Sequence, residues 1–458
     1  MKAGGPYSMT INDIVLNDIL VGDVFLCSGQ SNMELPVNRV MDKYADEIEG
    51  YENTSVRYVK VPYSYDFSQQ KEDIRPVTWR PMTTENVKDF SAICYFFSRL
   101  LERKMTNVPV GIINASWGGT PVEAWVSEKG LQNFPEYVHQ KALYEDTELV
   151  SRITETERLH QQAWNKVLYK SDAGLHGVTP WYAEDYDDSD WEKVDMFSDN
   201  WAIRNGRPLN GVHWFRKDFF VPEDWSGKEA VLRLGCIVDA DSVFVNGHFV
   251  GTVSYQYPPR IYKVPSKLLK KGKNQLTVRL FSYGGRPSFV KEKPYKLICD
   301  GKEVNLEGGW KHKIGTVMPP SPSSTAFHYT PVGLYNGMIY PLRHYTFKGV
   351  VWYQGESNVG RWSEYSSLLS ALIADWRTLF KDENLPFYII ELADFLAPDD
   401  PGRAAWAELR KQQAKTAREN AHVTLIKNSD TGEWNDIHPL DKKTAATRLV
   451  EAVIQNEK

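Results

Sequence analysis

The stretch DVFLCSGQSNMELPV, residues 23–37, decides how the fold of this chain is interpreted. After Asp23 come four consecutive apolar residues, Val24 to Cys27, a pattern typical of a strand that is buried on both faces. It then breaks into small and polar residues, with Ser28 and Ser31 three positions apart around Gly29. One of the two serines could be a nucleophile at the end of a strand, or the segment could be a plain turn.

Strand and helix patterns alternate on either side of this stretch. Apolar runs predict strands, and apolar residues at helical spacing predict helices between them. The predicted strands are 21–27, 108–113, 347–353, 386–392 and 423–426. The predicted helices are 90–104, 149–169, 365–380, 404–419 and 442–455. The alternation predicts an α/β domain with a parallel sheet covered on both faces, built from two separated pieces of chain.

The pattern between about residues 179 and 313 is different. Helical periodicity is absent there, and short alternating segments occur at 214–221, 229–237, 241–253 and 274–283. Asn246-Gly247 between two of these runs is a strong hairpin signal. The segment therefore predicts an all-β sandwich inserted into the α/β domain.

Composition excludes several classes of protein. The 458 residues suggest two or three domains, and a net charge of −5 offers no basic surface for nucleic acid. The four cysteines show neither a metal-binding nor a disulfide-scaffold spacing, and no apolar run approaches the length of a membrane span. The first residues, MKAGGPYSMTINDIVL, lack the apolar core of a signal peptide. The protein is therefore expected to be intracellular, or this is a trimmed or mature form of a secreted or periplasmic protein.

Four polar loops follow the ends of predicted strands, at 28–32, 114–120, 354–358 and 429–438. In open parallel sheets, ligands bind beyond the carboxyl ends of the strands, so these loops form one candidate site. His438 could act as a base and Asp436 could orient its ring. The Gly118-Gly119 pair could bring backbone N–H groups close to a substrate oxygen, or it could be only a tight turn.

Five motifs in order carry a resemblance to a known family. They are GQSNME (29–34), INASWGGTPVEAW (113–125), LYNGMIYPL (334–342), GVVWYQGESN (349–358) and DIHPLDK (436–442). This combination resembles the sialate O-acetylesterase family, within the wider SGNH or GDSL-like hydrolases. The resemblance implies a three-layer α/β/α domain and a serine esterase that removes O-acetyl groups from sugars through an acetyl-enzyme. It implies no metal and no cofactor.

The resemblance also implies residue roles. Ser31 matches the nucleophile, and its own N–H matches part of the oxyanion hole. Gly118, Gly119 and Gln354 match the other oxyanion-hole positions. His438 matches the base, and Ser28 has no role in the pattern.

The acidic partner of the base is open at this point. SGNH enzymes commonly place an aspartate three residues before the histidine, and that position holds Asn435 in this chain. Asp436, two residues before His438, is our choice. A serine–histidine dyad whose ring is oriented by a backbone carbonyl is the alternative.

The inserted segment has a resemblance of its own. Residues 239–251 look like part of the jelly-roll, sugar-binding-like domain of β-galactosidases, although a purely structural module is at least as good an interpretation. The predicted division is 1–170 and 314–458 for the hydrolase domain and 171–313 for the sandwich. Residues 1–20 look like the remnant of an N-terminal β-domain.

The expected substrate is an O-acetylated carbohydrate, first of all a 9-O-acetylated sialate. Acetylxylan or another hemicellulose acetate is the alternative, and a carbohydrate-binding protein with an inactive esterase domain is the alternative from another class. The abundance of aromatic residues, 15 Trp and 24 Tyr, hints at sugar stacking but also suits an ordinary core. The candidates for contact with the substrate are Trp117, Glu356, Asn358 and Arg361. Arg361 or Arg403 could hold the sialate carboxylate, or both could be surface charges.

Overall fold

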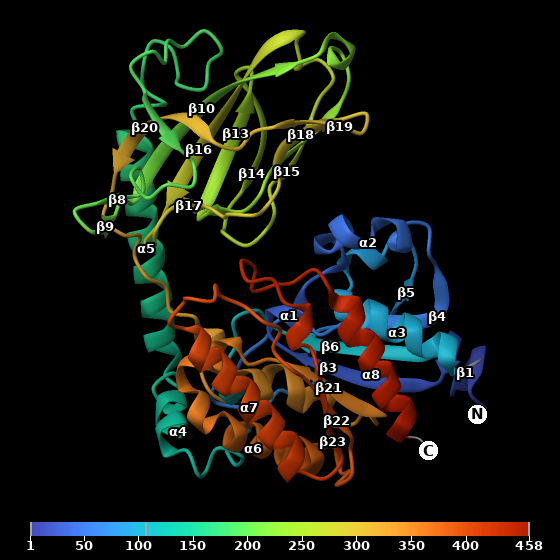
Figure 1. The fold of residues 1–458 in the computed structure, drawn as a ribbon. Helices are drawn as coiled ribbons and strands as arrows, with labels where there is room; N and C mark the ends of the chain where they lie inside the picture. Colours follow the sequence, from blue (N-terminus) through green and yellow to red (C-terminus); the bar gives the residue numbers. More distant parts are fainter. Residues whose placement is uncertain (1, 106–107, 457–458) are drawn as a thin grey trace. The chain divides into compact units, whose positions relative to one another are not determined.

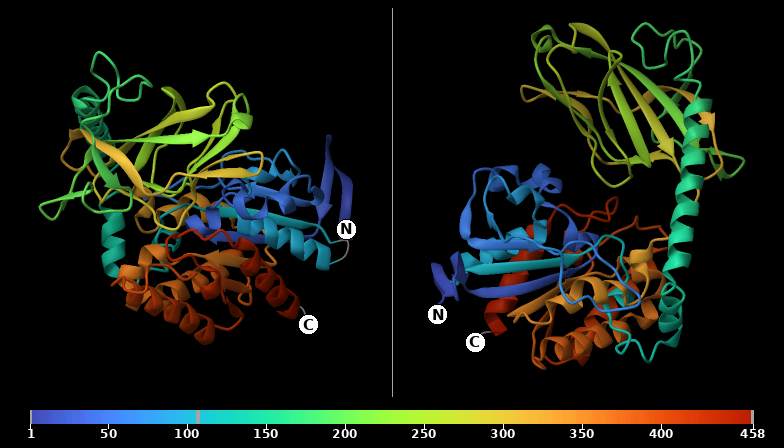
Figure 2. Two further views of the ribbon diagram at one scale, coloured as in Figure 1. Left: turned by 45° about the horizontal axis from the view of Figure 1, so that its top comes forward. Right: turned by 180° about the vertical axis from the view of Figure 1, so that it is seen from behind.

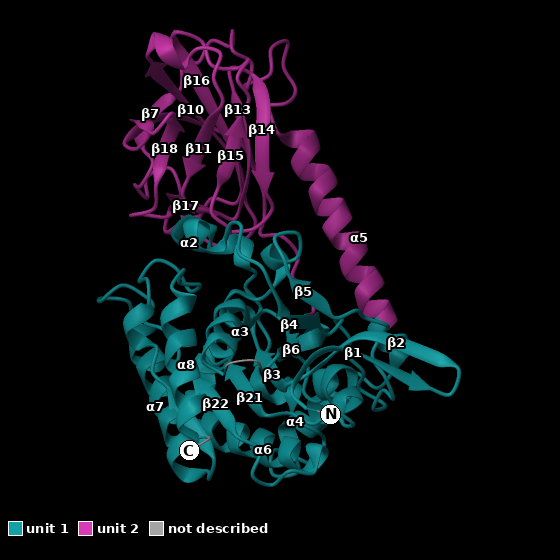
Figure 3. Cartoon of the chain, turned by 90° about the vertical axis from the view of Figure 1, so that its right-hand side faces the viewer, with its two compact units in different colours: residues 1–150, 326–458 teal, residues 151–325 magenta. Residues whose placement is uncertain are grey.

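The computed structural model describes residues 2–105 and 108–456. The chain divides into two compact units, shown in teal and magenta in Figure 3. The first unit combines Met1–Val150 with Ala326–Lys458, and the second is Ser151–Thr325. The predicted divisions after residues 170 and 313 both fall inside the second unit.

A seven-stranded sheet forms the centre of the first unit, in the order β23-β22-β21-β3-β6-β4-β5. Neighbouring strands pair in parallel, except that the edge strand β5 is antiparallel to β4. In Figure 1 the blue β3 lies between the cyan β6 and the orange β21, so segments far apart in the sequence share one sheet. The strands are β3 (Asp23–Gly29), β4 (Asn53–Lys60), β5 (Arg80–Met82), β6 (Val110–Ser116), β21 (Gly349–Tyr353), β22 (Phe387–Ile390) and β23 (Val423–Ile426).

The five strands predicted for this sheet are confirmed as β3, β6, β21, β22 and β23. Every residue of β21 and β22 is buried, which explains their wholly apolar sequences. The prediction missed β4 and β5. Strand β4 carries Arg57 and Lys60 among its apolar residues and lies next to the edge of the sheet, so its sequence lacks a continuous apolar run.

Two helix pairs pack beside the sheet, α3 with α8 and α6 with α7. Helix α3 begins after Ser91, whose side chain accepts the N–H of Cys94, and it ends after two basic residues that suit a helix C-terminus. The predicted helices are confirmed, with ends shifted by a few residues. The helices are α1 (Ser31–Glu34), α2 (Met41–Ile48), α3 (Ala92–Lys104), α4 (Pro135–Ala142), α5 (Thr147–Ser171), α6 (Trp362–Phe380), α7 (Arg403–Glu419) and α8 (Lys442–Asn456). Within the described ranges, no helix is both long and apolar enough to cross a membrane.

A separate hairpin precedes the sheet. Strands β1 (Gly4–Ile11) and β2 (Ile14–Val21) pair antiparallel as a two-stranded sheet. Most of their residues are exposed.

The second unit consists mainly of two antiparallel sheets, seen in Figure 2 as two layers of strands. One has the order β14-β13-β16-β10-β20-β7 and the other β15-β11-β18-β19. Apolar side chains of both sheets, such as Phe215 and Leu232, form one buried cluster between them. The predicted hairpin is confirmed, because Asn246 and Gly247 turn with φ of +49° and +79° between β13 and β14.

The bounds of the strands in the second unit are β7 (Glu192–Asp195), β8 (Ile203–Arg204), β9 (Arg207–Pro208), β10 (Gly211–Val221), β11 (Ala230–Leu234), β12 (Ile237–Val238), β13 (Ala240–Val245), β14 (His248–Val253), β15 (Ile261–Val264), β16 (Gly272–Ser282), β17 (Ser288–Phe289), β18 (Tyr295–Cys299), β19 (Lys302–Asn305) and β20 (Gly309–Val317).

Candidate active site

Ser31 is the first residue of the short helix α1, directly after β3 in the middle of the sheet. The chain leaves the strand through Gly29, whose φ is +138°. A Cβ at Gly29 would lie 2.1 Å from the main-chain oxygen of Tyr353 on the neighbouring strand. Only glycine therefore fits this close passage, which turns the chain and presents Ser31 half-buried at the carboxyl edge of the sheet.

The other serine of the motif has a structural role. Ser28 is fully buried, and its Oγ donates to the main-chain oxygen of Ala115 at 2.5 Å. Its hydroxyl joins β3 to β6 and does not face a substrate. Of the two serines, Ser31 is the one positioned as a candidate nucleophile.

Asn32 connects the segment that carries Ser31 to the segment that carries His438. Its Nδ2 donates to the main-chain oxygen of Ile437 at 2.9 Å and to Oε1 of Glu356 at 2.5 Å. Its Oδ1 accepts a hydrogen bond from Nζ of Lys442 at 2.6 Å. Because Asn32 follows Ser31 and Ile437 precedes His438, this one side chain holds two segments 405 positions apart next to each other.

His438 is largely buried, with 7% of its surface exposed. Burial is the main cause that lowers the pKa of its imidazole to about 3, and the nearby positive charges of Lys442 and Arg39 contribute to the same shift. The ring is therefore neutral near pH 7, which is the form that can accept a proton. Oδ1 of Asp436 accepts the main-chain N–H of His438 at 2.8 Å, so this carboxylate shapes the loop that carries the histidine.

The Gly118-Gly119 turn lies beside Ser31. A Cβ at Gly118 would lie 3.6 Å from the Cβ of Ser31. The N–H of Gly118 donates to Oε2 of Glu34 at 2.7 Å, and Oε1 of Glu34 accepts from Nζ of Lys60, also at 2.7 Å. The role of Gly118 as an oxyanion donor stays a prediction, and it requires this bond to Glu34 to open.

Gly119 occupies a position that no other residue fits well. Its φ is +76°, and a Cβ there would lie 1.8 Å from the phenolic oxygen of Tyr329. Within the two described ranges, no acceptor binds the N–H of Gly119. This N–H is therefore available to a bound group.

Gln354 is buried and its side-chain amide is already engaged. Its Nε2 donates to the main-chain oxygen of Thr120 at 3.2 Å and to Oδ1 of Asn358 at 2.7 Å, and its Oε1 accepts from Tyr365 at 3.0 Å. Both amide hydrogens thus brace the loops around the site. The predicted oxyanion role of Gln354 is untested, and it needs at least one of these bonds to be released.

Arg361 and Asn358 are linked through a shared contact with one buried carboxylate. Both bind the buried Glu123: Arg361 in an ion pair at 2.5 Å and Asn358 through Nδ2 at 2.9 Å. Arg361 also pairs with Glu364 at 3.1 Å. Arg403, the other arginine considered for a sialate carboxylate, pairs with Asp394 at 2.6 Å. These partners give both arginines a structural role in the unliganded protein.

Trp117 and Glu356, the other two candidates for substrate contact, are also occupied. The Trp117 ring is stacked between Tyr63 and His328, with centroids 4.2 and 4.5 Å away. Glu356 accepts from Asn32, and burial raises the pKa of its carboxyl group.

Sequence reasoning missed four polar residues of the site: Asn32, Glu34, Lys60 and Lys442. Asn32 and Glu34 stand in the quoted motif GQSNME, and Lys442 ends the motif DIHPLDK, so their position offered a signal. Lys60 ends β4, the strand that was not predicted. Lys442 is 1% exposed, and burial lowers its pKa to about 8.

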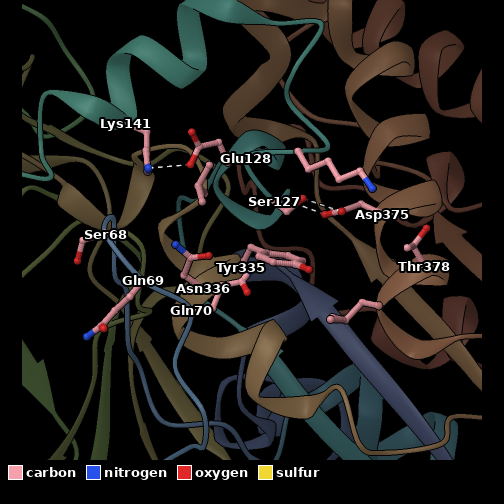
Figure 4. A pocket seen from close by; sticks show the side chains of 13 residues that line it. Ser68, Gln69, Gln70, Ser127, Glu128, Lys141, Tyr335, Asn336, Asp375 and Thr378 are labelled. Atoms are coloured by element: carbon pink, nitrogen blue, oxygen red, sulfur yellow. Dashed lines mark hydrogen bonds and ion pairs between the residues drawn. The ribbon is translucent and has the colours of Figure 1, made fainter.

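The first unit also has a cavity of about 620 Å³ that none of the candidate catalytic residues lines (Figure 4). Its polar groups bind one another. Asp375 accepts from both the N–H and the hydroxyl of Ser127 at 2.7 Å, and the buried Lys141 pairs with Glu128 at 2.8 Å. The polar groups that line this cavity are therefore paired with one another, and the cavity is not part of the candidate active site.

Two family models match the chain. One, described as "Carbohydrate esterase, sialic acid-specific acetylesterase", matches residues 21–169 and 311–455. The other, described as "Glycosyl hydrolases family 2, sugar binding domain", matches residues 151–309. The first match covers both pieces of the α/β unit, and the second covers most of the sandwich.

Curated relatives match the same family, and one solved structure has a similar fold. Sialate O-acetylesterase from Homo sapiens is 35% identical over 147 residues, which are 29% of this chain and 28% of that protein. The enzyme of the same name from Rattus norvegicus is 31% identical over 150 residues, 29% of this chain and 27% of that protein. The match thus spans less than a third of these relatives. A carbohydrate acetylesterase from Xanthomonas citri has a similar fold, with a TM-score of 0.53 and 21% identity over 98% of this chain and 60% of that one.

Proposed function

We propose, because this chain belongs to the carbohydrate esterase family of sialic acid-specific acetylesterases, that it removes O-acetyl groups from sugars. One observation carries the proposal: the hydrogen bond from Asn32 to Ile437 joins the neighbours of Ser31 and His438 across 405 positions of sequence. A serine next to a histidine at the carboxyl edge of a sheet is an arrangement that supports nucleophilic catalysis.

The proposed reaction has two halves. Oγ of Ser31 attacks the acetyl carbonyl carbon while the neutral ring of His438 takes its proton. The tetrahedral intermediate collapses, the sugar oxygen leaves with the proton from His438, and the acetyl group remains on Ser31. Water then attacks this ester, His438 again takes and returns a proton, and acetate leaves the free serine.

The negative charge on the carbonyl oxygen needs donors. We assign them to the N–H of Ser31, at the start of α1, and to the N–H of Gly119, which is available beside it. One such donor contributes on the order of 3–4 kcal/mol to the transition state. Gly118 and Gln354 are additional candidates whose present bonds must first open.

We assign Asp436 a positioning role. Its bond to the main-chain N–H of His438 supports this role, because it fixes the loop and not the tautomer of the ring. The pair Ser31 and His438 is then the reacting unit.

A 9-O-acetylated sialate is our first choice of substrate. The family description and the positive side chain of Arg39 near His438 support an anionic sugar. Acetylated xylo-oligosaccharide is the alternative. Acetate release from 9-O-acetylated sialic acid and from this oligosaccharide, measured side by side, decides between them.

We further propose an SGNH-type three-layer α/β/α fold for the first unit and a jelly-roll, sugar-binding-like sandwich for the second. The parallel strand pairs and the two helix pairs support the first assignment. The family 2 match over residues 151–309 supports the second. We place the hydrolase domain in two pieces around this sandwich.

The test of the catalytic proposal uses p-nitrophenyl acetate and a fluorophosphonate probe. Ser31→Ala should lose ester hydrolysis and labelling, and His438→Ala should lose about 10²–10⁴-fold in rate. Ser28→Ala, which removes the buried serine, is the matched control and should still be labelled. If Ser31→Ala hydrolyses the ester as fast as the parent protein, the proposal is wrong. A parent protein that binds sugars but takes up no probe would support the inactive, carbohydrate-binding alternative.

A further inference from the structure

We propose that Tyr63 and Tyr329 form a stacking platform for the pyranose ring of the acetylated sugar. The inference rests on the proposed function and deepens it, because it assigns residues that recognise the sugar and not the ester. It concerns two exposed aromatic rings that are both connected to the Gly118-Gly119 turn.

The first observation is a rigid stack of three rings. The ring of Trp117 lies between Tyr63, at 4.2 Å and 19° between planes, and His328, at 4.5 Å and 14°. Both faces of Trp117 are therefore covered, and it has no face left for a sugar. Tyr63 lies at one end of the stack and is 40% exposed. The role predicted for Trp117 thus passes to its neighbour.

The second observation connects Tyr63 to the candidate nucleophile. Nζ of Lys60 donates to the phenolic oxygen of Tyr63 at 3.0 Å and to Glu34 at 2.7 Å. Glu34 in turn accepts the N–H of Gly118, whose Cβ position is 3.6 Å from the Cβ of Ser31. Three consecutive hydrogen bonds therefore connect the phenol of Tyr63 with the turn beside Ser31.

The third observation places Tyr329 against the same turn. Its phenolic oxygen approaches Gly119 so closely that a Cβ there would lie 1.8 Å away. Its ring and that of His328 form a T-shaped pair, with centroids 4.5 Å apart and 70° between planes, and Tyr329 is 41% exposed. The two tyrosines are thus attached to opposite ends of one aromatic cluster.

Single exposed aromatic residues are common on protein surfaces and need no explanation. Two half-exposed tyrosines held in one aromatic cluster beside a nucleophile are a different case. The C–H face of a pyranose ring is apolar and packs on an aromatic ring, whose dispersion contacts and quadrupole favour it. Because their ring contacts with Trp117 and His328 already restrict the two tyrosines, little side-chain entropy is lost on binding. Lys60 adds a positive charge at 4.6 Å from the Tyr63 ring centre, which suits an anionic sugar.

The experiment compares a substrate with a pyranose ring and one without any ring. The variants are Tyr63→Ala, Tyr329→Ala, their combination and Tyr63→Phe. For each, kcat/KM is measured on an O-acetylated methyl glycoside of sialic acid and on ethyl acetate. We expect the double variant to lower the ratio of the two values by about tenfold, because stacking is lost only for the glycoside. Tyr63→Phe should retain most of the ratio, since it keeps the ring.

Direct binding separates this inference from the proposed catalysis. The same glycoside is titrated into Ser31→Ala, with and without the two tyrosine substitutions, and binding is followed by calorimetry. A roughly tenfold weaker affinity in the triple variant supports the platform even if no ester is hydrolysed. Tyr345→Ala is the matched control, because Tyr345 is 44% exposed in the same unit and stacks on Phe347, away from the Trp117 cluster. Equal affinity with and without the two tyrosines, or an equal loss in the control, overturns the inference.

Discussion

Replacing Asn32 by alanine removes the side chain that holds the candidate nucleophile segment and the histidine segment together. Three hydrogen bonds disappear: to Glu356 at 2.5 Å, to Ile437 at 2.9 Å and from Lys442 at 2.6 Å. Two of the partners are ionisable groups, for which a bond contributes about 1.5–3 kcal/mol each, and the carbonyl bond contributes about 1 kcal/mol. The sum is about 4–7 kcal/mol before water enters the gap. That is a large part of the 5–15 kcal/mol, roughly, that stabilises a typical domain.

The same substitution should weaken catalysis in the molecules that remain folded. Without the bond from Asn32, the main chain at Ile437 loses its anchor to the Ser31 segment. His438 follows Ile437 directly, so the ring can shift away from the serine. A displacement of about 1 Å in a reacting group costs on the order of 10²-fold in rate, so kcat/KM should fall by about this factor.

Both effects can be measured on one pair of variants. Calorimetry gives the stability of the unit, and hydrolysis of p-nitrophenyl acetate at a temperature below the transition gives kcat/KM. Asn38→Ala is the control, because Asn38 is an exposed asparagine six positions further along the same segment. If Asn32→Ala is as stable as Asn38→Ala, or keeps more than a third of the parent activity, the connecting role of Asn32 is refuted.

Three further predictions concern the loops around the site. Gly29→Ala should destabilise the first unit by about 2–4 kcal/mol in urea unfolding. The new Cβ would lie 2.1 Å from the main-chain oxygen of Tyr353, and alanine would have to adopt a φ of +138°. An unchanged urea midpoint would contradict this prediction. Arg361→Ala should cost about 2 kcal/mol of stability, because the buried carboxylate of Glu123 loses its ion pair. The loss is smaller than for a fully buried pair because Arg361 is 42% exposed. A higher KM for the sugar with an unchanged melting temperature would instead indicate that Arg361 contacts the substrate. Because the pKa of His438 is lowered to about 3, kcat/KM should stay level from pH 7 down to about pH 4, and a fall centred near pH 6.5 would show that the ring is not held neutral.

The sheet and its helices were largely predictable because burial leaves a local signature. Strand β21 is buried on both faces, so its sequence, GVVWY, is apolar or small throughout. Strand β4 escaped prediction because half of its side chains are only partly buried and include Arg57 and Lys60. Because β4 was not predicted, Lys60 was missed as well, and this residue donates hydrogen bonds to both Glu34 and Tyr63.

The place of the candidate site was also indicated, because the four polar loops follow strands of one sheet, three of which, β21, β3 and β6, are neighbours. What each side chain does there was not. Trp117 and Arg361 were expected to contact substrate, and the structure engages one in a ring stack and the other in ion pairs. Their residue types suit either role.

The sequence by itself determined an α/β sheet interrupted by a β-sandwich, and it singled out Ser31 and His438 through motifs at strand ends. These features depend on periodicity and on residues close together in the chain, so they can be predicted from local sequence patterns. Only the tertiary structure decided that Ser28 faces Ala115, that Asn32 joins the serine and histidine segments, and that Trp117 stacks on two other rings while Tyr63 stays 40% exposed. The physical reason is that the role of a polar or aromatic side chain depends on the groups that it contacts. These groups come from strands and loops that are distant in the sequence and that only folding brings together.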